Sequence, residues 1–177
     1  MRARDHLLLA LAGSIGPAWI RARRNAYRRI GSRVGGEDAV VLSRYFALDL
    51  LASVRVAVLE RTDEPWVFKL MSAVGRTPPV VMGGVSGLAV GDAVGIVRGS
   101  SRSTLFHELV HVGQYRRLGI ARFAREYVRG WIESGYEYAA IPLEAQAYEL
   151  QARFDAGDVF SVEASLAELG LGGRGSV

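Results

Sequence analysis

Large apolar side chains recur at helical spacing over residues 103 to 118. At 100° per residue, four of them project onto one side of this segment: Leu105, Phe106, Leu109 and Val112. Ser101 or Ser103 is placed to supply the N-cap oxygen, and Gly119 stands where a glycine commonly ends a helix. The pattern therefore predicts an amphipathic helix with one apolar side and one side available for other chemistry.

Further helices are expected downstream. Residues 121 to 134 have a helical pattern that Gly135 ends. Pro142 suits the first turn of the next helix, and an apolar stripe follows it: Leu143, Ala147, Leu150 and Phe154. Ser161 is expected to cap a last short helix, before a frayed tail over residues 170 to 177.

Upstream of residue 103 the pattern mixes helix and strand. Residues 38 to 51 have a helical spacing, set by Val41, Tyr45 and Leu48. Residues 54 to 60 are rich in β-branched side chains, and residues 93 to 97 form a short apolar run between glycines. Residues 75 to 95 begin with Gly75 and hold two prolines and five more glycines, which predict turns and short extended pieces. The fold class expected is α+β, with a small sheet beside the helix of residues 103 to 118.

Arginine is concentrated near the N-terminus. Residues 1 to 33 carry eight arginines against Asp5, a net of +7, so with +4 in total the other residues sum to −3. Within this region, apolar side chains recur at helical spacing: Trp19, Ala26, Tyr27, Ile30 and Val34. We expect this basic helix to pack its stripe on its own domain first; peripheral contact with an anionic membrane or a protein stays open. Binding of nucleic acid is not expected, because no recognition motif accompanies the charge.

The first 18 residues bear on targeting. An apolar run over residues 7 to 15 follows Arg2 and Arg4, and Ala18 ends a short small-residue stretch, as in a secretory signal. Asp5 and Pro17 interrupt that pattern, so we favour an uncleaved, cytoplasmic chain over secretion.

Length and composition allow one domain. The chain has 177 residues, 50% of them hydrophobic, with no cysteine and no run of 18 apolar residues. We divide it into a basic N-terminal segment (1–33), a central domain (34–157) and a short helix with a tail (158–177).

The segment His107-Glu-Leu-Val-His111 carries the strongest chemical signal. Four residues apart on a helix, the two imidazoles lie on one face and can bind one divalent ion, for which zinc is the expected choice. Glu108 projects about 100° away from His107, where it can accept a proton from a water on the metal. Gln114 and Tyr115 project to the same side and are candidates to orient a ligand.

A catalytic zinc site needs a third protein ligand, and without cysteine a carboxylate is expected. Glu144 is the best candidate, because it lies in the first turn of the helix at Pro142, at the margin of its apolar stripe. Glu133, Glu137 and Glu149 are the competing carboxylates, and His6 is the remaining histidine.

These residues carry a resemblance to a known family. Residues 104 to 115 and 141 to 148, with Arg44-Tyr-Phe-Ala47 and the strand at 54 to 58, resemble short bacterial zinc metallopeptidases of the zincin class. Those include a domain often encoded beside extracellular contractile injection systems. The resemblance covers roughly residues 40 to 155. It implies metal ligation by His107, His111 and Glu144, with Glu108 as the base.

The expected function is that of a zinc-dependent metallopeptidase acting on a peptide or protein substrate. In zincin-like enzymes an extended peptide can add to the sheet edge beside the active-site helix, and residues 93 to 97 are the candidate strand. Three tyrosines are available to stabilise the transition state: Tyr136, Tyr138 and Tyr148. A non-catalytic zinc-binding scaffold is the main alternative. A di-iron carboxylate bundle needs the Glu-x-x-His pair twice, and the chain has it once.

Overall fold

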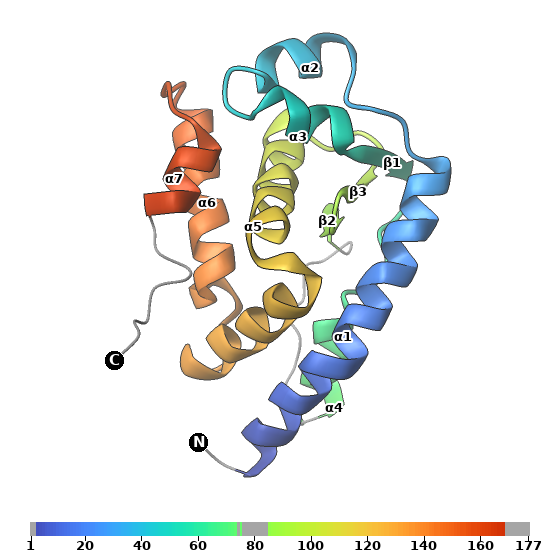
Figure 1. Cartoon of the computed structure of the whole chain (residues 1–177), viewed down its shortest axis with the longest axis vertical. Helices are drawn as coiled ribbons and strands as arrows, with labels where there is room; N and C mark the ends of the chain where they lie inside the picture. The colour runs from blue at the N-terminus through green and yellow to red at the C-terminus, as the bar shows by residue number, and fades with distance from the viewer. Residues whose placement is uncertain (1–2, 74, 76–84, 169–177) are drawn as a thin grey trace.

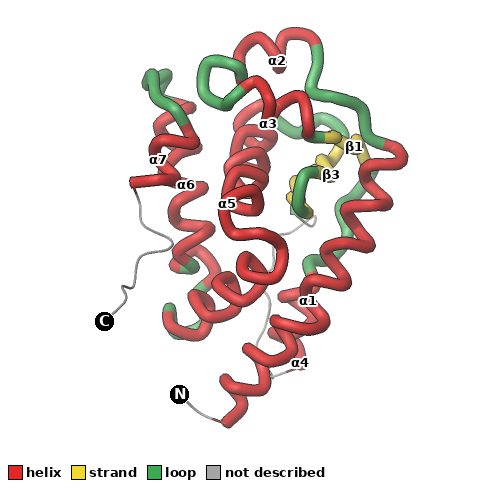
Figure 2. Tube along the Cα trace, in the orientation of Figure 1, coloured by secondary structure: helices red, strands yellow, loops and turns green. Residues whose placement is uncertain are grey.

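Helix α5 (Arg102–Glu133) forms the centre of the molecule (Figure 1). In this computed structural model, which describes residues 3–73, 75 and 85–168, the sheet and α1 (Ala3–Ile30) lie on one side of α5. Helices α6 (Pro142–Asp155) and α7 (Val162–Glu168) lie on the other. The described chain is thus mixed α+β and mainly helical, as Figure 2 shows.

Helix α5 consists of two helical stretches separated by Gly119. The Ser101 hydroxyl accepts a hydrogen bond from the N–H of Thr104 at 3.1 Å and caps the first stretch. At Gly119 the backbone has φ 72°, which breaks the helix and bends it before the second stretch; Gly135, with φ 70°, follows its end. The helices predicted for residues 103 to 118 and 121 to 134 are confirmed, together with their glycine stops.

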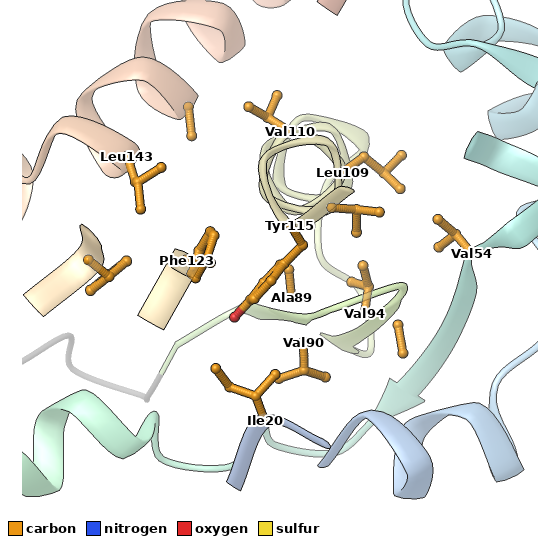
Figure 3. Packing of buried hydrophobic residues seen from close by; sticks show 14 of the residues in the cluster. Ile20, Val54, Ala89, Val90, Val94, Leu109, Val110, Tyr115, Phe123 and Leu143 are labelled. Atoms are coloured by element: carbon orange, nitrogen blue, oxygen red, sulfur yellow. The ribbon is translucent and has the colours of Figure 1, made fainter. Parts of the chain in front are cut away.

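The first stretch of α5 is enclosed on more sides than its predicted apolar face alone required. Every residue from 105 to 115 is buried, the two histidines included. In Figure 3, which looks along the axis of α5, side chains of the sheet (Val94) and of α6 (Leu143) lie on two sides of the helix. The side of the helix that carries His107 and His111 therefore faces protein.

The sheet has the strand order β1-β3-β2, from β1 (Arg55–Leu59), β3 (Ala93–Val97) and β2 (Gly87–Val90). β1 pairs with β3 in parallel, and β2 pairs with β3 antiparallel. The strands predicted at 54 to 60 and 93 to 97 are confirmed. β3, however, is the central strand and is paired on both sides, so it has no free edge. β2 is an edge strand, and it lies against α5.

Helix α1 is longer than the sequence pattern suggested. It starts at Ala3, runs through Pro17 and buries Leu8, Ala12 and Ile20, which belong to the same core as α5. The predicted stripe was only partly right: Tyr27 is buried, but Ile30 is 67% exposed and Val34 lies beyond the end of the helix.

Residues 38 to 51 do not form the single helix that was predicted. They contain α2 (Gly36–Leu42), a turn, and α3 (Leu48–Ser53), and Leu48 is 72% exposed. In the turn Tyr45 and Phe46 point inward and contact Phe106 of α5, at ring-centroid distances of 5.6 and 5.1 Å. Burying both rings requires the chain to turn where the spacing predicted a continuous helix.

The remaining helices complete the shell around α5. Helix α4 (Trp66–Ala73), which the pattern did not predict, contacts α1. A short 3-10 helix, η1 (Tyr138–Ala140), leads into α6. The Ser161 hydroxyl accepts a hydrogen bond from the N–H of Ala164 at 3.3 Å, which confirms it as the cap of α7. The tail at 170 to 177 lies outside the described residues. None of the described helices combines the length and the hydropathy needed to cross a membrane.

Candidate metal centre

The structure brings together the three side chains expected to bind a metal. The Nε2 atoms of His107 and His111 lie 3.1 Å apart on the first stretch of α5. Glu144, in the first turn of α6, places its Oε2 3.4 Å from Nε2 of His107 and 3.5 Å from Nε2 of His111. All three residues are buried.

These distances fit one tetrahedral ion. Zinc binds imidazole nitrogen and carboxylate oxygen at about 2.0 to 2.2 Å, so two ligand atoms of a regular tetrahedron lie about 3.3 to 3.6 Å apart. The triangle of 3.1, 3.4 and 3.5 Å is close to one face of such a tetrahedron. A fourth position would remain for water or substrate.

A chain of hydrogen bonds orients His107. Its Nδ1 lies 2.9 Å from Oε1 of Gln151, whose Nε2 donates to the Ser103 hydroxyl at 2.7 Å. The same hydroxyl donates to the Asp155 carboxylate at 2.9 Å. Because a carboxylate can only accept, the chain requires Nδ1 of His107 to donate, which leaves Nε2 free to bind a metal in the neutral ring.

A second chain orients His111 in the same way. Its Nδ1 lies 2.8 Å from Oε1 of Gln114, and the amide nitrogen of Gln114 donates to the carbonyl of Leu143 at 2.9 Å and to Oε1 of Gln146 at 2.8 Å. Because the Leu143 carbonyl can only accept, the amide nitrogen of Gln114 must face it and the amide oxygen must face His111, so Nδ1 of His111 donates. Gln114, which the sequence offered as an orienting residue, has this role, whereas Tyr115 stacks on Phe123 at 3.7 Å.

Two tyrosines hold the other oxygen of Glu144. Oε1 accepts hydrogen bonds from the hydroxyls of Tyr127 at 2.5 Å and Tyr138 at 2.9 Å. Oε2 is buried and has no hydrogen-bond partner among the described residues. A carboxylate oxygen left in this way carries a large desolvation cost unless a cation completes it. The residues present therefore fit a metal ion.

Protonation in the metal-free site follows from the same geometry. Burial would lower the pKa of His111, but the charge and hydrogen bonding of Glu144, the charge of Glu108 and the hydrogen bond to Gln114 together outweigh it and raise that pKa to about 9. Burial would raise the pKa of Glu144, yet the charge of His111 and the hydrogen bonds it accepts hold that pKa well below its usual range. A proton thus supplies the positive charge that the three ligands need, and a metal ion would displace it.

Glu108 stands beside this cluster without belonging to it. It is buried, and burial raises its pKa, an effect that His111 and His107 partly offset and Glu144 reinforces. The backbone of Ala89 in β2 also lowers that pKa, to a smaller extent. Gly87, also in β2, leaves the room it occupies, because a Cβ there would lie 2.6 Å from Cγ of Glu108.

A cavity of about 60 Å³ opens beside the three ligand atoms and Glu108. One water needs about 10 to 15 Å³, so the cavity has room for an ion with water. Its other walls are largely apolar and aromatic, with Trp19 of α1, Trp66 of α4 and Phe123 of α5 among them. A second cavity shares Gly87, His107 and Glu108 with the first and extends to Tyr148 and Gln151.

The competing residues lie elsewhere. Glu133, Glu137, Glu149 and His6 are all exposed, and the described cluster of potential metal ligands contains none of them. Of the three tyrosines, Tyr136 donates its hydroxyl to Asp5, away from the site. Tyr138 lines both cavities, and the Tyr148 ring lies 4.6 Å from that of His107.

Two functional residues escaped sequence reasoning, Gln151 and Tyr127. Gln151 had a signal, because Glu144, Tyr148 and Gln151 are spaced i, i+4, i+7 and share one face of α6. Tyr127 had no such signal in the sequence, because it lies on the second stretch of α5 and reaches Glu144 through the bend at Gly119.

Comparison with known proteins adds no relative: no protein-family model, curated protein or solved structure matches the chain.

Proposed function

We propose that this protein is a zinc-dependent hydrolase, and specifically a metallopeptidase. The observation that carries the proposal is the buried, unpartnered Oε2 of Glu144, which faces the Nε2 atoms of two histidines oriented for metal binding. His107, His111 and Glu144 would hold the ion, and Glu108 lies beside them without a place in the ligand set.

The chemistry divides between the ion and the chain. When bound, zinc supplies a Lewis acid that polarises a carbonyl and lowers the pKa of water. Glu108 accepts the proton as water attacks the scissile carbonyl, and then returns it to the leaving amine. Burial raises the pKa of Glu108, which suits a group that must both take and give a proton near neutral pH. Tyr138 lines both cavities and is the tyrosine best placed to reach substrate.

An extended peptide fits the outer edge of β2. The expectation that β3 receives it was wrong, because β3 is paired on both sides. Just before β2, the carbonyl of Ser86 accepts a hydrogen bond from the N–H of Val97 in β3. By antiparallel alternation the backbone groups of Gly87 and Ala89 therefore face away from β3. The outward backbone groups of Gly87 and Ala89 would then pair with a peptide lying next to Glu108.

The fold is compatible with the zincin class proposed from the sequence. A helix carrying His-Glu-x-x-His packs on a small sheet, beside an antiparallel edge strand, and the third ligand comes from a helix downstream. This arrangement supports the assignment through the site's geometry alone.

The test is the substitution Glu108→Gln. It keeps the size of the side chain but removes its ability to accept a proton, so zinc content and fold should be retained. Hydrolysis of a mixed peptide library should fall by roughly two to four orders of magnitude. The matched control is Glu149→Gln, an exposed glutamate of α6, which should leave hydrolysis unchanged.

A non-catalytic zinc scaffold is the alternative, and the same experiment separates it. If the wild-type protein binds one zinc ion and cleaves no peptide, the result supports the scaffold function and contradicts the proposed peptidase activity. If Glu108→Gln cleaves as fast as the wild type, the assigned base is wrong.

A further inference from the structure

The side of α1 that faces away from α5 has an unusual division of side chains. We call this the outer face of α1, and it comprises the exposed residues Leu7, Ala10, Ser14, Ile15, Ala18, Arg21, Ala22, Asn25 and Arg29. At 100° per residue they share one side of the helix. Figure 1 shows α1 running along the flank of the molecule, with the sheet and α5 on its other side.

The N-terminal half of the outer face is uncharged. No charged residue occurs between Leu7 and Ile20, about 20 Å of helix at 1.5 Å per residue. Leu7 is 60% exposed and Ile15 is 58% exposed, although each could have been polar without loss to the core. Single exposed apolar side chains need no explanation, but these two lie along one uncharged strip with Ala10 and Ala18.

The C-terminal half of the outer face carries positive charge that the protein itself does not neutralise. Arg24 and Arg28 pair with Asp92, and Arg23 pairs with Asp63. Arg21 and Arg29, on the outer face, have no carboxylate within ion-pair distance in the described part of the chain. The acidic residue of α1, Asp5, is buried and accepts a hydrogen bond from Tyr136, so it does not oppose them.

We propose that the outer face of α1 binds the surface of an anionic lipid bilayer. A helix lying in the interface buries apolar side chains at the boundary of the headgroups and acyl chains, while arginines beside them bind the anionic headgroups. Leu7 and Ile15 would enter the interface, and Arg21 and Arg29 would contact lipid phosphates.

A second copy of the chain is a poorer occupant. A stable protein interface takes about 20 to 30 residues from each side, whereas the outer face offers nine side chains of one helix. Its unpaired arginines favour a partner that is negatively charged across its whole surface.

The proposal is tested by flotation of the full-length protein with two kinds of vesicle, pure phosphatidylcholine and an equal mixture of phosphatidylcholine and phosphatidylglycerol. We expect binding to the anionic vesicles only, and its loss in about 1 M salt, where charges are screened within about 3 Å. The double variants Leu7→Asp with Ile15→Asp, and Arg21→Glu with Arg29→Glu, should each lower the bound fraction at least about tenfold.

Two matched controls make the site specific. Val40→Asp with Val159→Asp changes two exposed valines outside α1. Arg61→Glu with Arg117→Glu reverses the charge of two exposed arginines that also lie outside α1. Both controls should float like the wild type, with circular dichroism confirming that every variant is folded. Absence of binding to anionic vesicles, equal loss in the controls, or a dimer in light scattering that Leu7→Asp with Ile15→Asp disperses would each overturn the proposal.

Discussion

Each of the three candidate metal ligands is held by hydrogen bonds with its neighbours. His107 and His111 each donate from Nδ1 to a glutamine, Gln151 and Gln114, and those glutamines are fixed in turn by Ser103 and by the Leu143 carbonyl. Such contacts commonly change metal affinity by 10- to 100-fold when lost, without touching the metal. The precision of the site depends on them as much as on the ligands.

Glu144 offers the sharpest test at this scale. Replacing both Tyr127 and Tyr138 by phenylalanine removes the two donors to Oε1 and keeps the rings. We expect zinc affinity to fall by roughly 10- to 100-fold, because the carboxylate loses its fixed orientation and Oε1 is left buried without a partner. Competition with a zinc chelator measures this, and Tyr148→Phe, half exposed and without a bond to Glu144, is the control. Unchanged affinity in the double variant would show that the tyrosines do not position the ligand.

At the scale of elements, the edge strand β2 and the helix α5 fit together around one glycine. A Cβ at Gly87 would lie 2.6 Å from Cγ and 2.7 Å from Oε1 of Glu108. The backbone of Gly87 is not in the left-handed region, so an alanine there causes no backbone strain in β2. Its Cβ would instead clash with the Glu108 side chain.

Gly87→Ala should therefore displace Glu108 while leaving the metal ligands in place. A misplacement near 1 Å can cost about 100-fold in rate, so we expect peptide hydrolysis to fall by about that factor with zinc content unchanged. Zinc analysis and the peptide-library assay on the same preparation separate the two effects. Gly35→Ala, whose Cβ would meet only the Arg33 carbonyl oxygen at an ordinary contact distance of 3.9 Å, should behave as the wild type. Full activity in Gly87→Ala would mean that Glu108 can do its work from another position.

At the scale of the whole molecule, the candidate site joins parts that are otherwise separate in sequence. Its histidines come from the first stretch of α5, Tyr127 from the second, and Glu144 and Gln151 from α6. An ion bound there would link the two helices on which the sheet, α1 and α7 also pack.

Zinc should accordingly stabilise the entire fold. At free zinc of about 100 times Kd, linkage gives about 2.7 kcal/mol, and for a domain of this size each kcal/mol raises Tm by roughly 2 to 4 °C. We expect a rise of roughly 5 to 10 °C over protein treated with a chelator, measured by calorimetry. His111→Ala should bind little zinc and show no such rise, since two ligands hold zinc poorly. An equal rise in His111→Ala would place the stabilising ion elsewhere.

Local features of the fold were predictable because their causes are local. The spacing of His107 and His111, the cap at Ser101 and the stop at Gly119 each depend on residues within a few positions. The strands at 54 to 60 and 93 to 97 were visible in runs of β-branched and apolar residues. Pro142 and the stripe of α6 placed Glu144 at the start of a helix, and so made it the first choice among the carboxylates.

The sequence by itself determined the helix that carries His107 and His111, the position of Glu108 beside them, and the helix that supplies Glu144 as the candidate third ligand. Only the tertiary structure decided which strand is the edge, because β2 and β3 differ in their neighbours and not in their pattern. The sequence ranked Glu144 first among the carboxylates, and packing placed it beside the histidines by burying it while Glu133, Glu137 and Glu149 are exposed. Tyr127 and the pKa of His111 also depend on the bend at Gly119 and on burial, which are set by contacts between distant segments.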